Sequence, residues 1–105
     1  VGSRLGEANT LQAQGNLALT TGNDEQGITL LTQARQLYAL VGDRVGPLNI
    51  GITLAYRAAS NGDLATAITE LQPAADFCIA IGHPLGAQLQ TQIEQWQAEL
   101  SAPGL

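Results

Sequence analysis

An internal repeat with a period of 40 residues constrains this chain more than any other feature. The segment 41–46, VGDRVG, follows the pattern of 1–6, VGSRLG, and a third copy stands at 81–86, IGHPLG. A second series joins 27–31, GITLL, to 67–71, AITEL, at the same spacing. Self-similarity at about 20 to 50 residues is typical of proteins that stack copies of one supersecondary unit. The chain is therefore predicted to be a solenoid.

Glycines divide each repeat into two halves, because they recur every 20 residues at positions 2, 22, 42, 62 and 82. Glycine readily adopts the left-handed conformation that commonly follows a helix end. The residue after each glycine is suited to cap the next helix: these residues are Ser3, Asn23, Asp43, Asp63 and His83. Asn23 with Gln26 predicts a capping box. We therefore expect helices at 4–21, 24–41, 44–61, 64–81 and 84–101, joined by two-residue turns.

The two prolines near the last helix agree with these boundaries. Pro84 is expected at a first helical position, where the missing N–H costs nothing. Pro103 is expected to end the last helix. A third proline, Pro73, falls inside the fourth helix, where it removes a backbone hydrogen bond and crowds the preceding turn. The sequence therefore predicts a kink near residues 69–73.

The apolar residues recur three or four positions apart, which places them on one face of each helix. In the second helix this face is Ile28, Leu31, Ala34, Leu37 or Tyr38, and Val41. In the fourth it is Leu64, Ala67, Ile68, Leu71, Ala74 or Ala75, Cys78 and Ile81, and in the last it is Leu85, Leu89, Ile93, Trp96 and Leu100. Small residues let neighbouring helices approach closely: Gly15, Ala18, Gly51, Ala55, Ala58 and Ala59. The pattern predicts antiparallel helical hairpins.

The order of small and large residues resembles the tetratricopeptide repeat. The first copy reads Gly15, Gly22, Gly27, Leu31 and Ala34, and the second reads Ala55, Gly62, Ala67, Leu71 and Ala74. The 40-residue period is similar to a longer variant found in large bacterial regulatory and signalling proteins, whose turns often read Gly-Asp-Arg, as at 42–44. Ala18 and Ala58 depart from the family, which commonly has tyrosine there. The resemblance implies an all-α fold, a right-handed α-α superhelix of antiparallel helical hairpins with about five helices.

One domain is expected over 1–105, with repeats at 4–43 and 44–83 and a capping helix at 84–101, whose broad polar face suits the end of a stack. Residues 1–3 match the end of a preceding repeat, so we expect a fragment of a larger bacterial multidomain protein. The first helix would then expose Leu5, Ala8 and Leu11 where a neighbour packs, and a homodimer through this helix is an expected consequence.

The resemblance implies a protein-protein interaction module that binds a partner peptide or helix in a concave groove, made by the first helix of each hairpin. The candidate contacts are Asn9, Gln12, Asn16, Asn49, Ile52 and Tyr56. The alternative for this face is an ordinary solvated surface. Trp96, 40 residues beyond Tyr56, is predicted to pack in the core because it lies on an apolar stripe. The alternative function is a structural spacer or self-association domain.

Composition excludes other classes of function. Charged residues make up 12% of the chain, the net charge is −5, and the four cations are scattered arginines. No phosphate-binding stripe results, so no nucleic-acid partner is expected. The absence of lysine argues against the carboxylate clamp of some family members. No apolar run of about 18 residues predicts a membrane span.

Catalysis is not expected either. Cys78 and His83 are the single cysteine and histidine, and Cys78 is predicted to be buried while His83 caps a helix. No set of residues has the spacing of a metal site or phosphate loop, so we expect no enzyme, cofactor or metal. No segment resembles a signal peptide, and a cytoplasmic protein is expected.

Overall fold

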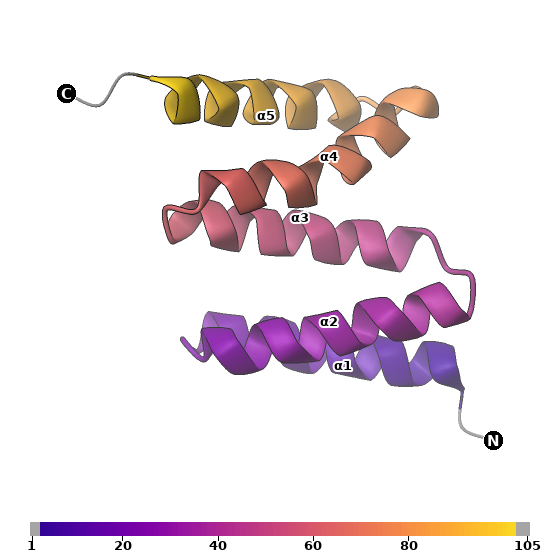
Figure 1. The fold of residues 1–105 in the computed structure, drawn as a ribbon. Coiled ribbons are helices and arrows are strands. Elements are labelled where there is room, and N and C mark those ends of the chain that lie inside the picture. The colour runs from indigo at the N-terminus through magenta and orange to yellow at the C-terminus, as the bar shows by residue number, and fades with distance from the viewer. Residues whose placement is uncertain (1–2, 103–105) are drawn as a thin grey trace. The chain divides into compact units, whose positions relative to one another are not determined.

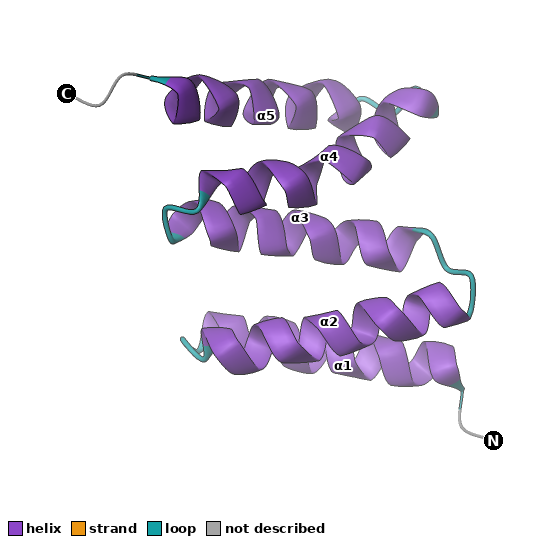
Figure 2. Cartoon of the chain, in the orientation of Figure 1, coloured by secondary structure: helices purple, strands orange, loops and turns teal. Residues whose placement is uncertain are grey.

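A computed structural model describes residues 3–102 of the chain as five helices in an all-α arrangement (Figures 1 and 2). They are α1 (Arg4–Thr20), α2 (Asp24–Leu40), α3 (Val45–Ser60), α4 (Leu64–Ala80) and α5 (Leu85–Ser101). Every boundary lies within one residue of the sequence prediction, and no strand occurs in this part of the chain. The all-α class is therefore confirmed. No helix among these five is both long and apolar enough to cross a bilayer.

The turns have the geometry that the glycine spacing predicts. Gly22, Gly42, Gly62 and Gly82 have φ angles of 85°, 78°, 83° and 71°. The next residue donates its N–H to the carbonyl five positions earlier, as from Asn23 to Ala18 and from His83 to Cys78, both at 2.8 Å. This bond closes the Schellman motif that ends a helix. The glycine at position 2 and the proline at 103 lie outside the described residues.

Four of the five predicted capping side chains accept a backbone hydrogen bond at the start of the next helix: Ser3, Asp43, Asp63 and His83. The capping box predicted for Asn23 is wrong, because the Asn23 amide makes no cap bond and instead donates to Thr21 Oγ1 at 3.3 Å. An amide has N–H donors, so the Asn23 side chain can donate to the Thr21 hydroxyl oxygen, whereas a carboxylate has no N–H to donate. Pro84 has helical dihedrals directly before α5 begins.

The chain divides into two compact units, one ending at Ile50 and the other beginning at Gly51. In the first unit α1 packs against α2 around two glycines. A Cβ atom on Gly15 would lie 2.7 Å from Leu31 Cγ and 3.1 Å from the Gly27 carbonyl oxygen. A Cβ on Gly27 would lie 2.7 Å from Leu19 Cδ2. The two helices can approach this closely only because both positions lack a side chain. The buried apolar residues of this unit are Ala8, Ala18, Leu19, Leu31, Ala34, Tyr38 and Ile50.

The second unit contains the rest of α3 together with α4 and α5. A Cβ on Gly86 would lie 2.8 Å from the backbone nitrogen of Ile79, so the backbones of α5 and α4 are in close contact there. Figure 1 shows α4 changing direction part-way along its length, as expected of a helix that contains Pro73. The buried apolar residues are Leu54, Ala55, Ala67, Leu71, Ala74, Ala75, Leu89, Ile93 and Trp96.

Several residues of the predicted apolar faces are not buried. Ile28, Val41, Ile81 and Leu100 are exposed, and Cys78 is half-buried. Val41 and Ile81 directly precede the turn glycines, where the chain leaves the helix and the packed face ends. Leu37 and Tyr38 were predicted as alternatives for one position on the apolar face of α2. Tyr38 is buried and Leu37 is only half-buried.

The predicted exposure of α1 is correct for Leu5 and wrong for Ala8, which is fully buried; Leu11 is half-buried. Ala8 lies seven residues before Gly15, which places both on the side of α1 that packs against α2. Leu17 is also exposed, but it lies 12 residues after Leu5, roughly 120° around the helix at about 100° per residue. The two leucines therefore do not form one continuous stripe.

Candidate partner-binding surface

An open depression of about 480 Å³ lies between α3 and α5 in the second unit. Its lining consists of Tyr56 from α3 and of Ala87, Gln88, Thr91, Gln92 and Gln95 from α5. The α5 residues are spaced by three and four positions, so they form one face of that helix. None of the six carries a charge. We call this surface the Tyr56 groove.

Tyr56 is held in the groove by the buried tryptophan beside it. The ring centroids of Tyr56 and Trp96 lie 5.3 Å apart with an interplanar angle of 68°, an edge-to-face contact. This arrangement is one that aromatic quadrupoles favour. Trp96 is 6% exposed, which confirms its predicted place in the core, whereas Tyr56 is 42% exposed. The phenol ring therefore packs against Trp96 and remains partly accessible.

The polar groups of the groove can both donate and accept hydrogen bonds. Thr91 donates its hydroxyl proton to the Ala87 carbonyl at 2.9 Å, within α5. Gln92 donates from Nε2 to Oε1 of Gln95 at 3.4 Å. Each carboxamide has two N–H donors and an acceptor oxygen, so these bonds leave donor and acceptor capacity on α5. A peptide main chain, which has one N–H and one C=O per residue, requires both.

Asn9 and Gln12, two of the predicted contacts, meet around Tyr38 in the first unit. The Tyr38 hydroxyl lies 2.5 Å from Asn9 Oδ1 and 2.7 Å from Gln12 Oε1. A phenol has a single proton, so the hydroxyl donates to one of these two amide oxygens at a time. These two amides therefore join α1 to α2.

Tyr38 itself is 3% exposed. Burial, and secondarily the negative charge of Asp43, raise the pKa of the Tyr38 phenol above its usual value. The hydroxyl therefore keeps its proton throughout the physiological range and can donate it to an amide oxygen of α1.

The remaining predicted contacts are more dispersed. Asn16 is exposed on α1, Asn49 is exposed on α3 and takes part in an interaction of its own, and Ile52 is half-buried. The structure thus brings Asn9 together with Gln12, and it places Tyr56 beside side chains of α5, the helix predicted to be a cap. Their spacing of three and four residues shows that they share one face of α5, but it does not show that this face lies beside Tyr56.

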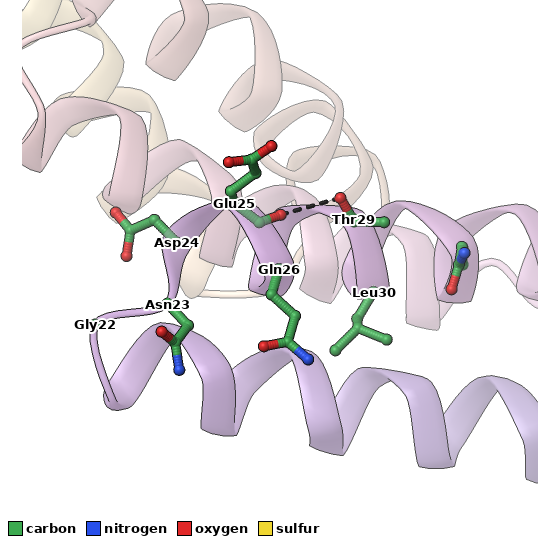
Figure 3. Close-up of a pocket in the computed structure, with 8 residues that line it drawn as sticks. Gly22, Asn23, Asp24, Glu25, Gln26, Thr29 and Leu30 are labelled. Carbon is green, nitrogen blue, oxygen red and sulfur yellow. Dashed lines mark hydrogen bonds between the residues drawn. The ribbon is translucent and has the colours of Figure 1, made fainter.

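A second depression, of about 750 Å³, lies along the first half of α2 and the turn before it. Figure 3 shows its lining: Gly22, Asn23, Asp24, Glu25, Gln26, Thr29, Leu30 and Gln33. Thr29 donates its hydroxyl to the Glu25 carbonyl at 3.0 Å, a bond internal to the helix. All these residues belong to one helix and its turn, so no second element provides an opposing wall.

Other chemistry finds little support in the described residues. Over 3–102, no three His, Cys, Asp or Glu side chains converge as a metal site. Within the same span every buried side-chain nitrogen or oxygen has a hydrogen-bond partner.

Comparison of the chain with protein-family models, with curated proteins and with solved structures found no match. The Tyr56 groove, with one supported aromatic ring and a row of carboxamides, is the candidate site.

Proposed function

We propose that this chain is a protein-interaction module whose Tyr56 groove binds an extended segment of a partner protein. The observation that supports this is the exposed Tyr56 ring, which packs edge-to-face on Trp96 and is flanked by uncharged carboxamides. Tyrosine is frequent among the residues that contribute most to binding. Carboxamides pair with the N–H and C=O groups of an extended main chain. The binding is passive, because the groove residues lie on helices and need little ordering.

The same proposal includes the architecture. The 40-residue repeat and the four Schellman turns support a tetratricopeptide-like array, with the right-handed superhelix of that family, within a larger bacterial multidomain protein. In such arrays the first helices of successive hairpins supply the binding surface. By its place in the repeat α5 is a first helix, so we assign it a binding role in addition to capping.

A random octapeptide display library tests the proposal. We expect it to yield peptides that bind the wild-type chain and lose most of their binding to Tyr56→Ala, because the aromatic contact is removed. The combined Asn9→Ala, Gln12→Ala variant is the matched control, since it also removes polar side chains from a first helix and should keep these peptides. Circular dichroism must show that each variant remains folded. The proposal is wrong if no peptide depends on Tyr56.

Self-association through α1 is the second candidate, and the exposure of Leu5 supports it. Burying an exposed leucine against a second copy of the chain would remove apolar surface from water, which favours association. Sedimentation velocity on the isolated chain should then show a dimer that Leu5→Asp dissociates. A monomer at high concentration would exclude it, and this outcome leaves the groove proposal unaffected.

A further inference from the structure

Glu99 extends the row of α5 side chains that lines the Tyr56 groove. Gln88, Gln92, Gln95 and Glu99 follow one another at spacings of four, three and four residues. At about 100° per residue, Glu99 points within roughly 20° of Gln88. Glu99 is exposed and lies in the last turn of α5. One turn before Gln88 the same face carries uncharged Pro84. On this face of α5 the carboxylate therefore stands at the C-terminal end only.

The position of Glu99 is electrostatically unfavourable for the helix itself. The last turn of a helix presents unpaired carbonyl groups and the negative end of the helix dipole, which disfavour an anion. The last turn of α5 contains no basic residue that would compensate. A cation placed at this end of the groove would interact favourably with both the carboxylate and the carbonyls.

Other charges near the groove do not change this polarity. Arg57 is the one cation in the sequence of α3, and it is half-buried and already engaged in an interaction. Asp76 on α4 accepts a hydrogen bond from Gln72 at 2.8 Å. Glu94 is exposed on α5 but lies roughly 120° from the Gln88 direction. The chain as a whole has a net charge of −5, which favours a basic ligand at longer range as well.

We infer that the Tyr56 groove takes an extended segment with an uncharged stretch and a lysine or arginine at one end. The uncharged stretch lies over Tyr56 and the α5 carboxamides, and the basic side chain reaches Glu99. This inference rests on the proposed peptide-binding function and adds the charge of the ligand and its direction along α5.

The peptides that depend on Tyr56 in the octapeptide library provide the test. Once aligned, they should be enriched in lysine or arginine at one end and depleted in acidic residues. Synthetic copies with arginine replaced by glutamine at that position should bind roughly 1.5-fold to fivefold more weakly, the effect of one exposed ion pair. The difference should shrink at 1 M salt, because screening weakens it.

Glu99→Gln should remove the preference for arginine, whereas Glu94→Gln, the same charge change on another face of α5, should keep it. Glu99→Gln relieves the unfavourable helix-end charge, so its melting temperature should not fall below that of the wild type. Peptides that depend on Tyr56 but show no basic preference, or keep it with Glu99→Gln, would overturn this inference alone. A library with no Tyr56-dependent peptide overturns the proposed function too.

Discussion

The first hairpin and the second unit both combine a tyrosine with side-chain amides, but they use the combination differently. In the first hairpin Tyr38 is buried and its hydroxyl engages Asn9 and Gln12, so these groups hold α1 to α2. In the second unit Tyr56 is exposed and the α5 carboxamides beside it line an open groove. The same chemistry therefore contributes to stability in one region and is left available to a ligand in the other.

The repeat shows where this difference arises. Forty residues after Gln12 and Tyr38 stand Ile52 and Cys78, so the second copy lacks both the buried phenol and one of its amides. Forty residues before Tyr56 stands Asn16, so the first copy lacks the exposed ring. The backbone pattern is maintained through the turn glycines while the side chains at these positions differ. Similar helices can therefore carry different functions in successive copies.

Truncating a buried leucine in each region should have the largest effect on stability, and it tests whether the two helical scaffolds are equivalent. Leu31 and Leu71 occupy equivalent repeat positions, and both are fully buried. Leu31→Ala and Leu71→Ala should each lower the free energy of unfolding by about 2 to 5 kcal/mol, through lost burial and the remaining cavity. Urea denaturation followed by circular dichroism measures this. A near-zero effect for one variant would show that the scaffolds are not equivalent.

Glycines at helix contacts should give the next largest effect. A Cβ on Gly86 would lie 2.8 Å from a backbone nitrogen, which cannot move aside as a side chain can. Gly86→Ala should therefore destabilise the chain by about 1 to 3 kcal/mol. Gly6→Ala is the control, because its Cβ would lie 3.6 Å from the nearest atom and alanine favours a helix by up to about 1 kcal/mol. Equal melting temperatures for the two variants would contradict the close packing of α4 and α5.

Removing one hydroxyl compares the two tyrosines directly. Tyr38→Phe should cost about 0.5 to 1.5 kcal/mol of stability, the net value of a typical hydrogen bond. Tyr56→Phe should change stability by less than about 0.5 kcal/mol, as is usual for a surface position. Thermal unfolding of both variants provides the measurement. A larger loss for Tyr56→Phe would reverse the roles that we assign to the two rings.

The smallest effect concerns the cap of α4. Hydrogen bonds from the Thr66 side chain and, secondarily, from the Thr66 backbone N–H hold the pKa of the Asp63 carboxyl below its usual value. The pKa of Asp63 in the folded chain is thus below the unfolded value of about 3.9. The ionised carboxylate therefore stabilises the fold above that pH. This contribution is lost as the pH falls through the folded pKa. Asp63→Asn should slightly lower the melting temperature at pH 7 and converge with the wild type near pH 2. A gap that does not change with pH would contradict this.

The fold could be predicted from the sequence because its signals are local. The glycines at 22, 42, 62 and 82 fixed the turns, and the residues between them had helical periodicity. Packing was less predictable where it depended on contacts across the hairpin. Ala8 was expected to be exposed, yet it shares the packed side of α1 with Gly15. The choice of Tyr38 over Leu37 depends on partners 26 and 29 residues away.

The candidate site was predicted only in part for the same reason. Tyr56 stood out as an aromatic residue on the expected binding face, and it does line the groove. Gln88, Gln92 and Gln95 looked like solvated residues of a cap, because a row of glutamines gives no local sign of a neighbouring helix. Conversely, Asn9 and Gln12 were assigned to ligand binding, and nothing in their own segment predicted the Tyr38 hydroxyl between them.

Nuclear magnetic resonance of the ¹⁵N-labelled chain, titrated with the tightest library peptide, locates the binding surface. We expect that the side-chain amide signals of Gln88, Gln92 and Gln95 and the indole N–H of Trp96 shift together and saturate. The amide signals of Asn9 and Gln12 should not move, because Tyr38 holds them within the first hairpin. Shifts that begin at Asn9 and Gln12 and leave the α5 glutamines unchanged would contradict this expectation.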